Sequence, residues 1–442
     1  MPEKLHGKCR GIMTISGLTR ISTMQMKSVH HRPKFQSRRF ADAFFDVDAT
    51  TTAANNGDAD AQSALGECYL QGNGVSPDLK EGVRLVSMAA AQGHPKAQFN
   101  LGQCFATGTG IGADLVEAAR YYKLSADQGF ADAQHNYSVC LAGGAGVSRD
   151  SSASAHYARL AAEQHHAAGL HNYGLCLADG VGVAQDLGQS ARYFKLAADL
   201  GVAFSQFNYA VRLATGTGVE ENPTEAARYY KLSADQGFAD AQYNFALLLL
   251  ESGLASNLGE AVRYMKLAAE QTPKGSSGGG TSSAGGSSNS SSNSSVAAAR
   301  WTVGMFCASG RGLPKDATEA VRWYRLAAAE GHAGAEYSLG VCHDHGLGVA
   351  QDDTEAVRWY RLAAAQRHAG AERALGECAM RGQGMDANAE LGARLFRSAA
   401  GRGDGKAAHN LSMCYAHGLG VTQDADKAER WAKWGVKCGY NV

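Results

Sequence analysis

The stretch RYYKLSADQGFADAQ decides the fold, because it spans Arg120–Gln134 and occurs again, letter for letter, at Arg228–Gln242. The two copies start 108 residues apart, which indicates a shorter internal period. With Ala61 taken as position 1 of a repeat, small residues return every 36 residues on both sides of one interruption. The position-1 residues are Ala61, Ala97, Ala133, Gly169, Ser205, Ala241, Ala299, Ala335, Ala371 and Ala407. The chain therefore contains ten repeats, and the quoted stretch recurs because 108 is three periods.

Each repeat is predicted to be two helices joined by a glycine turn. Its apolar residues recur with helical spacing. Positions 12 and 14 are both Gly in nine of the ten repeats, as in Gly346 and Gly348, where a helix stops and the chain turns with positive φ. Position 18 is Asp or Asn, as in Asp114 and Asp352, and is followed in several repeats by Glu or Gln three residues later. That pattern is typical of a capping box that starts a second helix.

Position 6 is small in every repeat, although Gly inside a helix costs about 1 kcal/mol relative to Ala. We therefore expect helix backbones to approach closely there. The position-6 residues are Gly66, Gly102, Ser138, Gly174, Ala210, Ala246, Gly304, Gly340, Gly376 and Ser412. One hairpin of this size buries too little surface to be stable alone and needs neighbours. The sequence thus predicts an all-α fold, a right-handed α–α superhelix (solenoid) of ten helix–turn–helix repeats.

The composition divides the chain into four segments. Residues 1–40 carry nine Lys or Arg and one acid, which indicates a basic arm or a transit peptide. Residues 41–272 hold a lead-in helix and repeats one to six, and residues 296–442 hold repeats seven to ten. Between them, 17 of the 23 residues 273–295 are Gly or Ser, typical of a flexible insert. The repeats either form two arms or continue as one stack past the insert; the undisturbed period favours the stack.

The sequence also bears on the compartment. No apolar run approaches the ~20 residues that a membrane span needs. Seven of the ten cysteines occupy position 8, one per repeat. Equivalent residues in adjacent repeats should lie about 9–10 Å apart, beyond the ~7 Å limit for a disulfide, so we expect reduced packing residues and no disulfides. These features predict an intracellular, preferably cytoplasmic protein, or a mitochondrial or plastid one if residues 1–40 are a transit peptide.

No motif predicts catalysis, a cofactor or a metal. Cys342-His343-Asp344-His345 has metal-ligand residue types, but adjacent residues of a helix point in different directions and cannot easily converge on one ion. No Ser/His/Asp or Cys/His set is linked by spacing or repeated. We therefore expect a protein without an enzymatic activity.

The second helices carry a basic stripe. Position 24 is Arg in nine repeats, and position 27 is basic in nine. Three residues apart, the two positions share a helix face, an arrangement suited to following an RNA backbone. Glu117, Glu225, Glu319 and Glu355 each lie three residues before an Arg, however. The stripe is therefore interpreted first as a salt-bridged solvated surface, with RNA binding as the alternative.

Repeat eight carries the fullest form of a known pattern. Its residues are Ala335, Leu339-Gly340, Gly346, Gly348-Val349, Asp352, Ala356, Trp359 and Ala363-Ala364. The chain thereby resembles the Sel-one-like repeat (SLR) family, a relative of tetratricopeptide solenoids. The resemblance implies scaffold and adaptor roles in assembling other proteins, without naming a partner. A secreted branch linked to β-lactam binding has paired cysteines in each repeat, which this chain lacks.

The resemblance also suggests where partners bind. In tetratricopeptide relatives the first helices line the concave surface, where side-chain amides can hold an extended peptide. Position 4 supplies such amides here, and Arg212 replaces Cys at position 8 of repeat five. The candidate partner-binding residues are Asn100, Asn136, Asn172, Asn208, Arg212, Asn244 and Asn410. Two interpretations stay open: the amides form a peptide groove, or they bond neighbouring repeats and fix their register.

Overall fold

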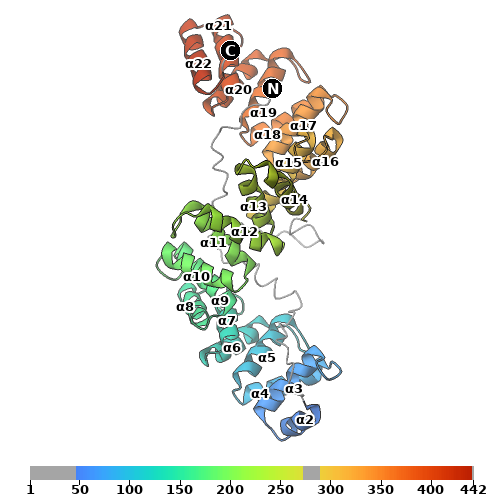
Figure 1. The fold of residues 1–442 in the computed structure, drawn as a ribbon, viewed down its shortest axis with the longest axis vertical. Coiled ribbons are helices and arrows are strands. Elements are labelled where there is room, and N and C mark those ends of the chain that lie inside the picture. The colour runs from blue at the N-terminus through green and yellow to red at the C-terminus, as the bar shows by residue number, and fades with distance from the viewer. Residues whose placement is uncertain (1–45, 272–288, 441–442) are drawn as a thin grey trace. The chain divides into compact units, whose positions relative to one another are not determined.

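A computed structural model describes residues 46–271 and 289–440, and all regular elements within those ranges are helical (Figure 1). The predicted basic arm, residues 1–40, and residues 273–288 of the predicted insert lie outside the described ranges. The lead-in helix is α2, Val47–Asn55. The all-α prediction is confirmed for the described residues.

The ten repeats each contribute a first and a second helix. The first helices are α3 Ala59–Gln71, α5 Pro95–Thr107, α7 Ala131–Gly143, α9 Ala167–Asp179, α11 Ala203–Thr215, α13 Ala239–Glu251, α15 Asn289–Ser309, α17 Ala333–His345, α19 Ala369–Arg381 and α21 Gly405–His417. The second helices are α4 Leu79–Ala91, α6 Leu115–Asp127, α8 Ser151–Glu163, α10 Leu187–Asp199, α12 Pro223–Asp235, α14 Leu258–Ala269, α16 Ala317–Ala328, α18 Asp353–Ala365, α20 Ala389–Gly401 and α22 Ala425–Lys437. A 3₁₀ turn, η1 Ala255–Asn257, precedes α14.

The described residues form two compact units. The first runs to Gln236 and holds α2–α12, and the second starts at Gly237 and holds α13–α22. Within each unit, every helix packs against the next one along the chain, as expected for an α-solenoid. In the second unit α14 packs on α15 across residues 272–288, so repeats six and seven stack on each other. Helix α15 begins at Asn289, inside the segment that the sequence predicts to be a flexible insert.

The predicted capping residues start the second helices. Asp114 Oδ1 accepts the backbone N–H of Glu117 at 3.1 Å, and Asp352 Oδ1 accepts that of Glu355 at 2.9 Å. In repeat six Asn257 makes no such bond, and the 3₁₀ turn takes the place of the paired-glycine turn. Side-chain caps therefore begin the second helix in nine of the ten repeats.

The second glycine of the turn brings consecutive repeats together. Gly348 has φ +72°, and a Cβ there would lie under 3.0 Å from the backbone carbonyl of Ala317, the first residue of the preceding second helix. The same approach recurs at position 14 of six other repeats, at Gly110, Gly146, Gly182, Gly218, Gly384 and Gly420. Glycine is thus required both for the backbone angle and for the space.

Position 6 is small because the second helix approaches it with both backbone and side chain. The expected backbone contact is present: a Cβ on Gly102, Gly304 or Gly376 would lie 3.2–3.3 Å from the carbonyl oxygen at position 22 of the same repeat. A Cβ on Gly340 would lie under 3.0 Å from the ring of Tyr360, which belongs to position 26 of the same repeat. Gly102 meets Tyr122 in the same way, and the equivalent pairs are Gly174 with Phe194, Gly304 with Tyr324 and Gly376 with Phe396. In these repeats the second helix lays an aromatic ring on the glycine of the first.

Substituting Gly340 by Val should lower the melting temperature of the chain, because overpacking a filled core costs about 1–3 kcal/mol. Gly401→Ala is the control, since a Cβ at Gly401 meets nothing within 4 Å and Ala is the better helix former. Thermal unfolding followed by circular dichroism measures both. Equal melting temperatures for Gly340→Val and the wild type would contradict the ring-on-glycine packing.

Buried side-chain pairs fix the register within and between repeats. Gln62, at position 2, accepts a hydrogen bond from Gln92 at 2.8 Å and donates one to the carbonyl of Ala54 in the preceding helix at 3.0 Å. Position 32 donates to position 2 in the same manner in four further repeats: Gln128 to Gln98, Gln164 to Gln134, Gln236 to Gln206 and Gln271 to Gln242. Each such pair ties both ends of a hairpin together.

The pair varies in the other repeats. In repeat eight Gln366 donates to Glu336 at 2.8 Å. Arg300 pairs with Glu330 in repeat seven, and its Nε also donates to the carbonyl of Ala269 at 2.9 Å. Repeat nine reverses the charges, with Arg402 Nη1 2.7 Å from Glu372 Oε2. In repeat four the same two positions are Leu170 and Leu200. Complementarity at positions 2 and 32 is therefore kept while the chemistry varies.

Reversing only one partner of the Glu372–Arg402 pair should destabilise the second unit. Arg402→Glu places two carboxylates together, one of them on a nearly buried Glu372, at a cost of about 1–2 kcal/mol after allowance for the partly exposed arginine. Adding Glu372→Arg recreates the arrangement of Arg300 and Glu330 and should restore most of the loss. Urea unfolding measures the two variants; a double variant less stable than Arg402→Glu alone would refute the pairing.

Candidate functional site

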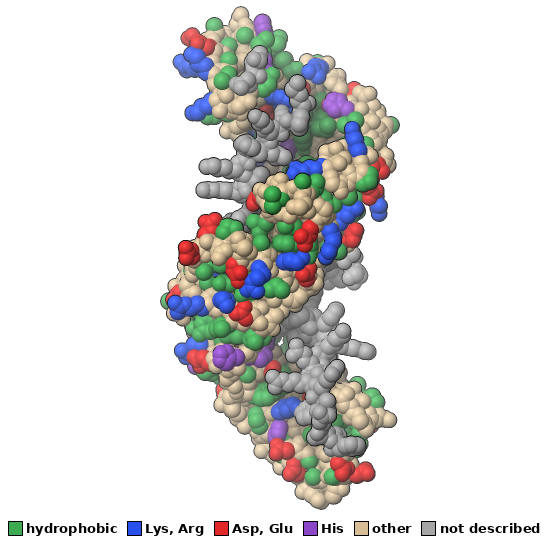
Figure 2. All heavy atoms as spheres, in the orientation of Figure 1, with side chains coloured by type: hydrophobic (Ala, Val, Ile, Leu, Met, Phe, Trp, Pro, Cys, Tyr) green, Lys and Arg blue, Asp and Glu red, His purple; other side chains and the backbone are tan. Residues whose placement is uncertain are grey.

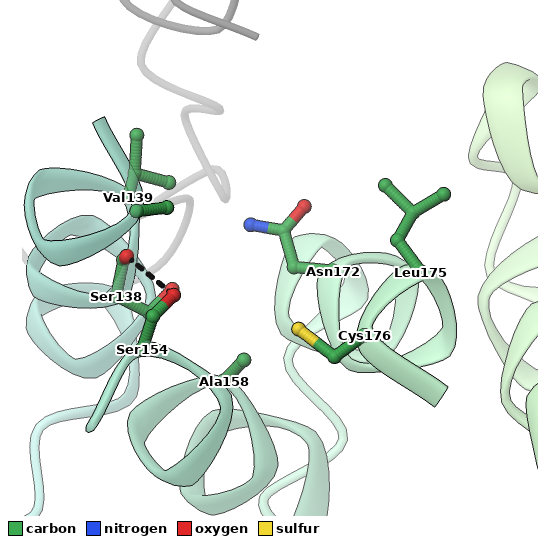
Figure 3. A pocket seen from close by; sticks show the side chains of 8 residues that line it. Ser138, Val139, Ser154, Ala158, Asn172, Leu175 and Cys176 are labelled. Atoms are coloured by element: carbon green, nitrogen blue, oxygen red, sulfur yellow. Dashed lines mark hydrogen bonds between the residues drawn. The ribbon is translucent and has the colours of Figure 1, made fainter. Parts of the chain in front are cut away.

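The first helices of the first unit present one accessible row, here called the first-helix face. It consists of positions 4, 7 and 11 of three first helices. These residues are Asn136, Val139 and Gly143 of α7, Asn172, Leu175 and Asp179 of α9, and Asn208, Val211 and Thr215 of α11. At position 7 the row is apolar and half-buried, with Val139, Leu175 and Val211 in succession. Val139, Asn172 and Leu175 line a common pocket between α7 and α9 (Figure 3). The face thus combines aliphatic side chains with the amides predicted from the sequence.

The amides of position 4 are mostly engaged within the molecule. Asn172 lies 3.2 Å from His135 Nδ1 of the preceding repeat, and Asn410 Nδ2 donates to Glu377 Oε1 of the preceding repeat at 3.2 Å. Asn244 Nδ2 donates to the carbonyl of Asp240 at 2.9 Å. The contacts of Asn172 and Asn410 join neighbouring repeats and give these two amides a role in register, whereas Asn244 bonds within its own helix.

The three remaining amides differ from one another. Asn136 is half-buried beside the Tyr122 hydroxyl, and Asn208 is half-buried on α11. Asn100 is only 5% exposed, and its Nδ2 is sealed from solvent without a partner among the described residues. Of the six candidate amides, Asn136, Asn208 and Asn410 therefore keep the most solvent contact.

Arg212 is buried on α11. Its side chain is 9% exposed, and its guanidinium lies 5.0 Å above the ring of Phe194 of α10. Within the described residues no hydrogen bond or ion pair engages the guanidinium. Burial lowers the pKa of Arg212, and the nearby carboxylate of Asp179 opposes that change. Arg212, which the sequence predicts as a binding residue, therefore lies near the carboxylate of Asp179, a residue that the sequence did not indicate.

Asp179 is the last residue of α9 and the acid nearest to Arg212. Half-buried, it has its pKa raised to about 6, because desolvation outweighs the attraction of Arg212. The two groups do not reach ion-pair distance, since no nitrogen–oxygen separation falls within 4.0 Å. An acid at a helix C-terminus also faces the negative end of the helix dipole.

The pocket beside the first-helix face exists because repeat three lacks the ring of position 26. Ala158 stands where Tyr122 and Phe194 stand in the neighbouring repeats, and position 6 is Ser138 instead of Gly. The Ser154 hydroxyl donates to the Ser138 carbonyl at 2.8 Å (Figure 3). The cavity volume is about 10 Å³, room for about one water molecule and for no larger ligand.

Filling this cavity should stabilise the first unit. The double variant Ser138→Gly, Ala158→Val reproduces the Gly66–Val86 arrangement of repeat one and is expected to raise stability by about 0.5–2 kcal/mol. Ala158→Val alone is the matched control, because the Ser138 side chain then obstructs the added methyl groups. Differential scanning calorimetry compares the two, and a double variant no more stable than the single one would count against the complementarity of positions 6 and 26.

The basic stripe of the second helices is largely paired. Arg120 Nη2 lies 2.7 Å from Glu117, and Lys123 Nζ lies 2.5 Å from Asp127 on the same helix. Position 24 pairs with position 21 in four other repeats, at Arg84–Glu81, Arg228–Glu225, Arg322–Glu319 and Arg358–Glu355. Figure 2 shows basic and acidic side chains next to one another across the visible face. The stripe has the character of a salt-bridged solvated surface.

The cysteines of position 8 pack in the core, as predicted. Cys104, Cys140, Cys176, Cys342, Cys378 and Cys414 are buried, and Cys68 is half-buried. Burial raises the pKa of the Cys104 and Cys140 thiols to about 11. Of the Cys342–His345 run, Asp344 accepts hydrogen bonds from Tyr360 at 3.2 Å and Gln383 at 2.9 Å. Residues 46–271 and 289–440 contain no cluster of three His, Cys, Asp or Glu side chains arranged for a metal.

These features define a helical-repeat scaffold, a class of fold that commonly mediates protein interactions. The Sel1 repeat family model matches ten segments: residues 59–94, 95–130, 131–166, 167–202, 203–238, 239–273, 297–332, 333–368, 369–404 and 405–433. The chain therefore belongs to the Sel1 repeat family, a non-catalytic scaffold type. None of the described helices has the length and apolar character to cross a membrane.

One solved structure with an SLR fold agrees with this assignment. The chain is similar to c5321, a protective antigen of uropathogenic Escherichia coli strains displaying an SLR fold, with 26% identity, a TM-score of 0.67 and 89% of each chain covered. It is also similar to a Sel1 repeat protein from Oxalobacter formigenes, with 24% identity, a TM-score of 0.37, and 83% of this chain and 89% of that one covered. The comparison with curated proteins gave no match.

Proposed function

We propose that the chain is a protein-interaction scaffold without enzymatic activity, and that the first-helix face of its first unit holds an extended segment of a partner protein. The observation that carries the proposal is the row of Val139, Leu175 and Val211, half-buried on three successive first helices. A peptide-binding surface needs such apolar contacts together with polar groups that fix the main chain. Asn136 and Asn208 supply the polar groups.

The row crosses three successive first helices of one unit. An extended segment lying across it therefore contacts more than one helix. RNA binding by the second helices has weaker support, because most of their position-24 arginines are ion-paired.

Leu175→Glu should reduce the capture of partner proteins at least tenfold, because it places a charge in the middle of the apolar row. Leu196→Glu is the matched control: Leu196 is 44% exposed on α10, a second helix of the same repeat. Purified full-length variants are incubated with native cell extract, cross-linked and analysed by quantitative mass spectrometry. Circular dichroism establishes that both variants remain folded.

Two outcomes would count against the proposed face. In the first, Leu196→Glu loses the partners while Leu175→Glu keeps them, which would move binding to the second helices. In the second, ribonuclease treatment releases the captured proteins from the wild type, which would show that RNA bridges them. A steep loss of capture between low and moderate salt would point the same way.

A further inference from the structure

Arg212 and Asp179 place opposite charges in adjacent repeats. Position 8 is Cys in repeats one to four and becomes Arg212 in repeat five. Position 11 varies from repeat to repeat and is Asp179 in repeat four. The two residues add opposite charges to neighbouring helices, α9 and α11, yet the charges do not close into an ion pair.

An arginine that is only 9% exposed and whose guanidinium has no partner among the described residues is costly, because structural roles normally engage its donors. Phe194 supports its face at 5.0 Å and holds it in place without satisfying its five N–H groups. Its nitrogens are not among the polar atoms sealed from solvent without a partner, so a ligand can still reach them. The same holds for the carboxylate of Asp179, which is half-buried.

The pair selects the chemistry of its ligand. A lone anion would meet the carboxylate of Asp179, and a lone cation would meet the guanidinium of Arg212. A neutral group with one acceptor and one donor satisfies both residues. Because a trans peptide group points its C=O and N–H to opposite sides, it presents these two functions in opposite directions.

We infer that Arg212 and Asp179 are an open ion pair that binds one peptide group of a partner's main chain, with the guanidinium donating to its carbonyl oxygen and the carboxylate accepting its N–H. The inference rests on the proposed function and deepens it. Leu175 lies one turn before Asp179 on α9, and Val211 adjoins Arg212 on α11. The open pair therefore sits beside the apolar row and fixes the main chain of the segment whose side chains contact that row.

The test uses peptides from a phage-displayed random dodecamer library selected on the wild-type full-length chain. Binding of synthetic hits is measured by fluorescence anisotropy on Arg212→Gln and Asp179→Asn, with Arg325→Gln, an exposed-surface change in α16 without an ion partner among the described residues, as control. Each of the first two variants is expected to weaken binding at least tenfold, and the double variant hardly further. N-methylation of one peptide nitrogen in a hit should cause a similar loss.

The results separate the inference from the proposed function. Hits that bind Arg212→Gln and Asp179→Asn as tightly as the wild type, or that tolerate N-methylation at every position, overturn the inference and leave the scaffold function standing. A library that yields no hit on the wild type overturns both. Arg212→Lys serves as a second variant, because it keeps the charge and loses the planar fork.

A ligand-free measurement tests the open state of the pair. The titratable groups in reach of Asp179 are the guanidinium of Arg212 from α11 and the thiol of Cys176 from its own helix, whose pKa burial raises to about 11 so that it stays neutral. A carboxyl whose folded pKa is raised to about 6 contributes stability below the unfolded pKa, near 4, and loses it as the pH rises through 6. Asp179→Asn should therefore raise the melting temperature at pH 8 and have little effect at pH 4. A lowered melting temperature at pH 8 would show a closed ion pair and overturn the inference.

Discussion

The close approach of each glycine turn to the preceding second helix is the contact on which the rest of the structure depends. At Gly348 the chain has no room for a Cβ beside the carbonyl of Ala317, and the same holds at the equivalent glycines of six other repeats. The turn of each such hairpin therefore packs against the first residue of the second helix in the preceding repeat. Because seven of the ten repeats make this contact, consecutive first helices within a unit expose equivalent positions.

A second layer of contacts holds each hairpin in register. Positions 2 and 32 pair through amides in most repeats, through opposite charges at Arg300–Glu330 and Glu372–Arg402, and are both leucine at Leu170 and Leu200. Aromatic rings at position 26 press on the glycines of position 6. Positions 2, 6, 26 and 32 of the 36-residue repeat are thus occupied by packing contacts. The proposed binding function falls to positions of the first helices that differ between repeats, among them the buried Arg212 and the half-buried Asp179.

Much of the fold could be predicted from the sequence, because turn glycines and capping residues act locally and recur with one period. Gly346 and Asp352 are examples: each acts within its own turn. The partner of Gly340 could not be predicted, since a small residue does not reveal whether a ring or a backbone lies on it. Asp179 was missed because position 11 varies from repeat to repeat and is also acidic at Glu251, so the sequence does not single out one acid there. Asn172 and Asn410 show why the amides were ambiguous, as their bonds to neighbouring repeats depend on packing.

The central claim is that stacking uses the second helices and turns, and leaves the first-helix face of the first unit as the binding surface. Hydrogen–deuterium exchange of the full chain, with and without a bound partner segment, tests it most directly. The account predicts slower exchange in the C-terminal halves of α7, α9 and α11, around residues 139–143, 175–179 and 211–215, with little change in α8, α10 and α12. Protection confined to those second helices would contradict it.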